Sequence, residues 1–337
     1  MKKSLLALAV LGAFAGAASA QSSVTLYGKV DLGVRKAAGS TDKEIADAHG
    51  SRLGVRGVED LGGGLRAMFG FEHRFSPDTG VSNGTSTGVV TAPATSAPNG
   101  GGVFWQGYST VGLGGAFGTV NLGRQYTAAF SLAQNAFDPF GGDTVGGLRG
   151  NSLTGAGAGA RIRTQNSLRY DGTFGGLKVA ADIAELEAGS PNKRPYSVAV
   201  QYAAGPVLAA VGYDNPTGAN DNLMTAGVGF TFGPARITAA IGSGETNAAT
   251  NNKIKQGLVG ASFNVGAGRV LVGFAQQKIG TTLVAGTSTG LTVKKTSLGY
   301  RHDLSKRTQL YTDVSRVSWT ASGTEKNAYD FGVQHNF

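Results

Sequence analysis

The sequence contains no cysteine, and only 15% of its 337 residues are charged. The lack of cysteine excludes a disulfide scaffold and a zinc ribbon, and the charged fraction is below the ~25% that is usual for soluble domains. After residue 20, no uninterrupted apolar run reaches the ~18 residues of a membrane-spanning helix. A hydrophobic fraction of 41% nevertheless excludes a disordered chain.

Glycine and positive charge are what the sequence has in excess. There are 55 glycines, and the formal net charge is +9 with a pI of about 9.7. Such a basic balance suits nucleic acid, anionic membranes or small anions as partners, and composition alone does not choose among them.

Residues 1–20 have the three parts of a secretory signal peptide. Lys2 and Lys3 are basic, residues 5–14 are apolar, and Ala18-Ser19-Ala20 is a small-residue cleavage site. A membrane anchor is the alternative, but the apolar run is short for a span and no basic residues follow it. We therefore expect cleavage after Ala20, which leaves residues 21–337 as a single exported domain.

From residue 23 onward, apolar and polar residues alternate with a period of two. In the segment 23–35, Val24, Leu26 and Val30 fall on one face, whereas Lys29 and Asp31 fall on the other. The same alternation recurs in 65–75, 196–202, 207–213, 224–232 and 329–337. This period indicates strands with one apolar face, and no amphipathic helix follows the signal peptide.

The connectors between these segments come in two alternating sizes. The short ones are 59–64, 114–118, 172–176, 205–206, 233–234, 266–268 and 304–307. The long ones are 36–50, 76–102, 126–160, 187–194, 215–222, 243–253, 280–291 and 320–327. These connectors separate sixteen strands and leave both chain ends on the short-turn side. That layout is typical of an outer-membrane β-barrel.

Three alternatives to the sixteen-stranded barrel follow from the same pattern. An eighteen-stranded barrel stays open, because the alternation is weak in 254–264 and 270–279. A soluble propeller would show a repeat of ~40 residues, which is absent. A soluble β-sandwich would not need a polar second face on nearly every strand.

Four segments resemble the trimeric porins of Gram-negative bacteria, specifically their β-proteobacterial branch. They are QSSVTLYG at 21–28, SRLGVRGVEDLGGGL at 51–65, GTVNLGRQY at 118–126 and FGVQHNF at 331–337. A fifth, DPFGGD at 138–143, resembles the acidic stretch of the constriction loop in enterobacterial general porins. The resemblance implies an all-β, transmembrane, sixteen-stranded antiparallel β-barrel with an inward-folded third external loop.

Motifs for catalysis and cofactor binding give no support for an enzyme. Gly-x-Ser-x-Gly occurs at 84–88 and 286–290, but both copies lie in Ser/Thr/Gly-rich loops without the following helix of a nucleophile elbow. The four histidines lack metal-ligand spacing, and no dinucleotide or Walker A loop is present. We expect no enzymatic activity, no cofactor and no metal.

Arginines on the polar faces of strands are the candidate basic side of a pore constriction. The alternation places Arg52 and Arg56 opposite lipid-facing Leu53 and Val55, and it turns Arg161, Arg163 and Arg169 inward as well. Charge on the lipid face costs about 2–4 kcal/mol for arginine at mid-membrane, which favours this orientation. Alternatively, these cations only solvate the lumen or bind lipopolysaccharide phosphate at the rim.

The resemblance adds roles to some of these residues. Arg52, Arg163 and Arg124 match constriction arginines of the family, although the parity of Val120 and Leu122 turns Arg124 outward unless a bulge at Gly123 restores its aim. The family's arginine on the fourth strand is absent, since 106–108 reads Gln-Gly-Tyr. That difference weakens the basic cluster.

The connector 126–160 is too long for an ordinary connection. The resemblance implies that it enters the barrel, where Asp138 and Asp143 would face the arginines across the pore. An ordinary external loop is the alternative.

The predicted function is passive diffusion of small hydrophilic solutes and ions through an outer-membrane porin, with mild anion preference. A substrate-specific channel and a structural or adhesive surface barrel are the alternatives. The resemblance implies a homotrimer as well. Expected partners are outer-membrane lipids and lipopolysaccharide, small solutes and anions, and the barrel assembly machinery, which reads the terminal Phe337. No nucleic acid is expected.

Overall fold

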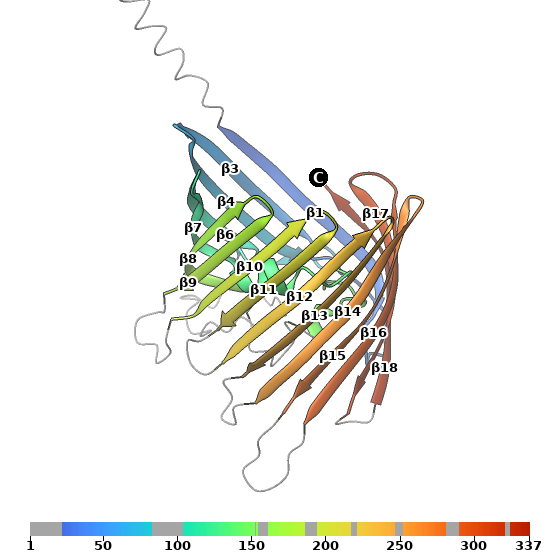
Figure 1. The fold of residues 1–337 in the computed structure, drawn as a ribbon. Helices are drawn as coiled ribbons and strands as arrows, with labels where there is room; N and C mark the ends of the chain where they lie inside the picture. Colours follow the sequence, from blue (N-terminus) through green and yellow to red (C-terminus); the bar gives the residue numbers. More distant parts are fainter. Residues whose placement is uncertain are drawn as a thin grey trace, which may run out of the picture.

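Sixteen long antiparallel strands form one closed barrel in the computed structural model (Figure 1). The structure describes residues 22–82, 104–151, 153, 161–185, 194–216, 221–246, 252–280, 290–320 and 324–337. The predicted signal peptide and the Ser/Thr/Gly-rich segments 84–88 and 286–289 lie outside these ranges.

The barrel strands follow one another around the wall in chain order. They are β1 (Ser23–Lys36), β3 (Arg52–Gly62), β4 (Leu65–Ser76), β6 (Tyr108–Gly115), β7 (Gly118–Tyr126), β8 (Arg163–Phe174), β9 (Leu177–Ala184), β10 (Tyr196–Ala204), β11 (Val207–Asn215), β12 (Asn222–Phe232), β13 (Ala235–Glu245), β14 (Lys253–Val265), β15 (Gly268–Ile279), β16 (Leu291–Asp303), β17 (Thr308–Trp319) and β18 (Thr324–Asn336). Two short pieces, β2 (Glu44–Ala46) and β5 (Val81–Ser82), belong to long connectors.

The first strand closes the ring. Residues 23–29 of β1 pair with β3, and residues 29–36 pair with β18. The backbone N–H of Gly28 donates to the carbonyl of Phe337 at 3.0 Å, and that of Phe337 donates back at 3.1 Å. Closure leaves no free sheet edge in the membrane, where an unpaired backbone group would be costly.

The predicted strand count and connector pattern are confirmed, and the eighteen-stranded alternative is wrong. Each of the seven short connectors joins two directly paired strands, for example β12 to β13 through residues 233–234. The strand ends that the long connectors follow lie at the opposite end of the barrel from the short turns (Figure 1). Among the described residues, no helix is both long and apolar enough to cross a membrane.

The two faces of the wall differ in chemistry as the alternation predicts. Apolar side chains such as Val211 and Val228 are exposed on the outer face, whereas Asp214 and Thr225 on the inner face are fully buried. Exposed aromatic residues stand on the outer face near the short turns: Phe117, Phe174, Tyr202, Phe230, Phe232, Phe263 and Phe337. Such an aromatic girdle marks a membrane interface in β-barrels.

The connector between β7 and β8 packs against the wall through inward-facing residues. It contains the π-helix η1 (Phe130–Gln134) and the 3₁₀-helix η2 (Arg149–Asn151), with Phe137 and Leu148 in its apolar cluster. A Cβ atom on any of five wall glycines would lie less than 3.0 Å from another side chain, and in each case a residue of this connector is among those met: Gly212, Gly227, Gly260, Gly273 and Gly299. A larger residue at any of these positions would force a neighbouring side chain to shift, so the close approach of the connector accounts for part of the glycine excess.

Candidate pore constriction

Three cations stand directly opposite one another on neighbouring strands. In the sheet register Lys29 of β1 pairs with Arg52 of β3, which pairs with Arg74 of β4. Like charges directly opposite are destabilising in a sheet. The repulsion among these three cations therefore lowers the stability of the folded barrel.

Neutral acceptors hold these guanidinium groups and extend the row. The Gly50 carbonyl accepts from Arg52 Nε at 2.9 Å and from Arg74 Nη1 at 3.4 Å. The Tyr126 hydroxyl accepts from Arg74 Nη2 at 3.3 Å and from Arg163 Nη2 at 2.6 Å. We call Lys29, Arg52, Arg74 and Arg163 the arginine row. Arg74 is also paired with Glu72 at 2.7 Å, so its charge is neutralised.

Arg124 is buried beside the arginine row. Its Nε donates to the carbonyl of Gln106 at 3.1 Å, and it lies within electrostatic range of Arg163. Gly123 has a φ of +116°, and the register between β7 and β8 shifts between Gly123 and Gln125. The strand irregularity that an inward-facing Arg124 would need is thus present, although the extra residue lies in β8 and not at Gly123 of β7.

That extra residue interrupts the alternation predicted for 161–171. Asn166 has a φ of 52°, the only positive value of a non-glycine residue in the described part of the chain. Two residues of β8, Gln165 and Asn166, stand against the single Arg124 of β7. A single uninterrupted alternation through this segment is therefore wrong, even though Arg163 and Arg169 both contact inner-wall residues.

Arg161 and Arg169 carry their charges in ion pairs. Arg161 precedes β8 and donates from Nη2 to Asp214 at 2.8 Å, with both side chains buried. Arg169 donates from Nε to Asp171 at 2.8 Å and also bonds the carbonyl of Tyr126. Arg56 lies 5.3 Å from the ring of Tyr27. The hydrogen bonds of Arg161 and Arg169 therefore attach the connector to the barrel wall.

The two acids of the connector have different surroundings. Asp138 is buried, and its carboxylate accepts the backbone N–H groups of Phe140, Leu148 and Arg149 at 2.7–2.9 Å. Burial raises the pKa of Asp138. The Asp143 side chain is 44% exposed, lies 3.5 Å from Arg149 and is within electrostatic range of Lys29 and Arg74.

Inner-wall carboxylates hold the connector to the barrel. Asp182 accepts the N–H of Ala128 at 2.6 Å, and Asp214 accepts that of Arg161 at 2.6 Å. On the far side of the barrel, Asp330 accepts the N–H of Val145 at 2.9 Å. Lys295 adds a bond to the carbonyl of Gly147 at 2.6 Å. The connector is therefore attached at both ends and in its middle.

The remaining residues singled out from the sequence can also be located. The Phe337 side chain is 43% exposed at the barrel seam, next to Gly28. Within the described ranges, no three His, Asp or Glu side chains gather as a metal site would require. The alternation in 65–75, with Phe69 and Phe71 on the lipid face, predicts that Arg74 faces the lumen. Sequence reasoning did not identify Tyr126 and Gly50 as the acceptors of the row.

A family model described as Gram-negative porin matches residues 7–334. The chain belongs to the Gram-negative porin family. This porin is 33% identical to outer membrane porin protein 32 of Delftia acidovorans, over 99% of its own chain and 95% of the relative. It is 28% identical to an outer membrane porin protein of Bordetella pertussis over the whole of both chains.

Solved structures agree with the fold. An anion-selective porin from Comamonas acidovorans is 27% identical and superimposes with a TM-score of 0.75, over 94% of this chain and 100% of that one. The trimer form of OmpT from Vibrio cholerae has a TM-score of 0.69 at 13% identity, over 94% and 99% of the chains. The porin is thus an outer-membrane channel for passive diffusion. Family and fold point to a channel rather than an enzyme.

Proposed function

We propose that this porin conducts small hydrophilic solutes with a mild preference for anions, set by the arginine row. The proposal is carried by the acceptors of two arginines. The carbonyl of Gly50 accepts a hydrogen bond from Arg52, and the hydroxyl of Tyr126 accepts one from Arg163. Because both acceptors are neutral, they fix the two guanidinium groups without cancelling their charge. Cations lining a narrow water-filled passage attract anions and raise the barrier for cations. The name of the anion-selective Comamonas acidovorans relative supports the same direction.

The connector between β7 and β8 narrows the channel in this proposal. Its bonds to Asp182, Asp214 and Asp330 on inward-facing wall positions support this placement. Asp143 is the acid that faces the arginine row, whereas Asp138 stabilises the conformation of the connector by accepting three of its backbone N–H groups. Two unit charges about 4 Å apart interact by ~1 kcal/mol in water and ~4 kcal/mol near a protein surface. An ion in the passage then experiences a field that salt weakens.

The zero-current potential of single channels in a KCl gradient tests the anion preference. Arg52→Ser with Arg163→Ser should move it toward cation preference, and Asp143→Asn should move it the other way. Both shifts should shrink in molar salt. The matched control, Arg66→Ser with Lys178→Ser, removes two inner-wall cations outside the row and should have a smaller effect. Equal effects of the two double variants would place the selectivity elsewhere.

The mature porin is, in this proposal, a homotrimer of residues 21–337 after removal of the signal peptide 1–20, without catalytic activity or cofactor. The trimer form of the OmpT neighbour and the exposed aliphatic residues of β1, such as Val24 and Leu26, support the assembly. An unheated detergent gel should show a band of three times the monomer mass that disappears on boiling.

Lipopolysaccharide is the lipid partner in this proposal. Five exposed cations stand on the outer face toward the long connectors: Lys253, Lys255, Lys278, Lys294 and Arg316. We call them the outer basic belt. Lys255 pairs directly with Lys278 in the register. Such a like-charged pair gains stability from phosphate groups of a neighbouring lipid.

A further inference from the structure

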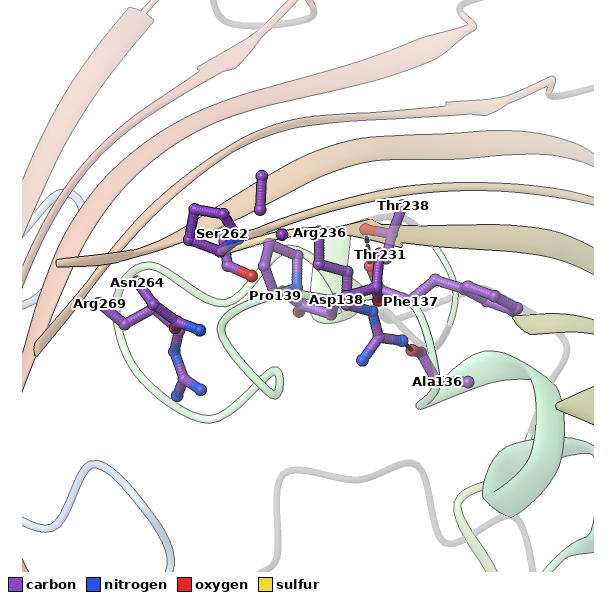
Figure 2. Close-up of a pocket in the computed structure, with 13 residues that line it drawn as sticks. Ala136, Phe137, Asp138, Pro139, Thr231, Arg236, Thr238, Ser262, Asn264 and Arg269 are labelled. Carbon is purple, nitrogen blue, oxygen red and sulfur yellow. Dashed lines mark hydrogen bonds between the residues drawn. The ribbon is translucent and has the colours of Figure 1, made fainter. Parts of the chain in front are cut away.

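A cavity of 260 Å³ lies between the β7–β8 connector and the inner wall, away from the arginine row (Figure 2). Residues 136–139 of the connector line one side, and strands β12 to β15 line the other. The short turn at 233–234 contributes to the lining, so the cavity opens at the short-turn mouth of the barrel. Short turns of such barrels face the periplasm.

Two arginines give this cavity its charge. Arg236 of β13 and Arg269 of β15 both line it, and Figure 2 shows the Arg236 side chain reaching toward Ala136 of the connector. Arg236 Nη2 donates to the carbonyl of Ala136 at 3.3 Å. Within the described part of the chain, no carboxylate lies within 4.0 Å of either guanidinium.

The register neighbours of the two arginines are neutral except for one cation. Arg236 stands between Thr231 and Ser262, and Arg269 stands between Asn264 and Arg301, which is itself paired with Asp313 at 2.8 Å. Asp138 is the only acid of the described lining, and three backbone N–H groups of the connector already engage its carboxylate. The cavity therefore presents two guanidinium groups together with hydroxyl and amide donors. Among its described lining residues, no carboxylate is left to compete with a bound anion.

This chemistry fits a small oxyanion. Arginine presents N–H donors in a planar fork that matches phosphate and carboxylate oxygens. The volume is just below the ~300–1,000 Å³ of drug-sized ligand sites, which suits phosphate or a small carboxylate better than a nucleotide. We propose that Arg236 and Arg269 form a weak binding site for small oxyanions at the short-turn mouth, separate from the constriction. The inference rests on the proposed conduction of small ions through the channel, and it adds a second anion contact to the arginine row.

Sided addition of inorganic phosphate to single channels tests this site. Because the chain has no cysteine, Ala267→Cys in a short turn lets an impermeant thiol reagent report the orientation of each channel. Phosphate on the short-turn side should reduce the chloride current at a concentration at least about threefold lower than on the other side. Arg236→Ser with Arg269→Ser should abolish this difference. Arg66→Ser with Lys178→Ser, which removes the same charge outside the cavity, should keep it.

The possible outcomes separate the oxyanion site from the anion preference proposed for the arginine row. Equal sensitivity from both sides, or equal loss in the control variant, overturns the site even where the zero-current potential shows anion preference. A sided phosphate effect in a channel without that preference overturns the role of the arginine row and leaves the site standing. Loss of sidedness in the Arg236 and Arg269 variant alone, in an anion-preferring channel, supports both.

Discussion

The guanidinium of Arg163 lies over the ring of Tyr126, 4.2 Å from its centroid, and donates to the hydroxyl of the same residue at 2.6 Å. That hydroxyl also accepts from Arg74. One neutral side chain thus sets the positions of two cations on strands that are not neighbours, and it does so at the root of the β7–β8 connector. Tyr126 is a positioning residue for the proposed constriction.

Replacing Tyr126 by Phe should weaken selectivity while the barrel stays folded. The ring remains for the cation–π contact, but Arg163 and Arg74 lose a shared acceptor whose bonds to charged groups are each worth about 1.5–3 kcal/mol. We expect the anion-to-cation permeability ratio to fall about twofold with little change in conductance. Tyr126→Leu, which also removes the ring, should lower it further. A wild-type ratio in both variants would refute the positioning role.

Asp214→Asn should loosen the connector. Asp214 accepts three bonds from Arg161, and breaking a buried ion pair from one side costs about 3–5 kcal/mol. Single-channel currents of this variant should be noisier, and trypsin should cleave after Arg149 or Arg161. Glu44→Gln is the control, because it breaks an exposed ion pair, with Arg35, that does not involve the β7–β8 connector. Equal noise and cleavage in the two variants would contradict the anchoring role.

His49 should make the barrel less stable in mild acid. Burial lowers the pKa of His49 well below its usual 6.5, and its ring stands edge-on to Tyr311 at 4.7 Å. The unfolded chain then binds this proton more readily than the folded one, so stability decreases as the pH falls below ~6.5. The temperature of heat-induced unfolding should drop between pH 7.5 and 5.5. In His49→Gln the drop should be smaller; an equal drop would assign it to other groups.

The outer basic belt should bind lipid A through its phosphates. Lys255→Ser with Lys278→Ser should lower the number of lipid A molecules retained on the purified porin, counted by native mass spectrometry. Lipid A without phosphates should bind equally weakly to the variant and the wild type. Arg66→Ser with Lys178→Ser, on the inner wall, should retain lipid A as the wild type does. Unchanged retention in the belt variant would remove the belt from the lipid contact.

Deletion of Phe337 should impair assembly. The residue ends an alternation of apolar side chains at 329, 331 and 333 that assembly factors are expected to read, and its backbone also closes the seam with Gly28. We expect less porin in the outer membrane and more in periplasmic aggregates, by fractionation. Phe337→Tyr keeps an aromatic terminus and should assemble normally. If the deletion also inserts normally, the terminal signal lies elsewhere.

Sequence reasoning predicted the barrel well because each strand carries its own information. A period of two needs only the residues of one strand, and a short turn needs only a few glycines, as at 233–234. The inward aim of Arg52 follows from its neighbour Leu53 in the same way. These features are local, so neither the strand order nor the register had to be known.

The site was harder to predict because its decisive contacts are distant in sequence. Arg161 is hydrogen-bonded to Asp214, 53 positions away in the sequence, and Val145 is hydrogen-bonded to Asp330, 185 positions away. Neither partner could be identified before the register around the ring was known. The positive φ of Asn166 is also invisible to an alternation argument, which is why the pattern failed there.

The connector uses wall acids as its supports: Asp182, Asp214 and Asp330 each accept one of its backbone N–H groups. The same bonds keep those three carboxylates out of contact with a passing ion. Excising the connector would therefore not simply produce a wider hole. It would return acidic groups to the water of the lumen while Arg52 and Arg163 stayed in place, and the truncated channel would admit cations more readily without the loss of a single wall arginine. Part of the proposed anion preference would thus come from the acidic groups that the connector covers.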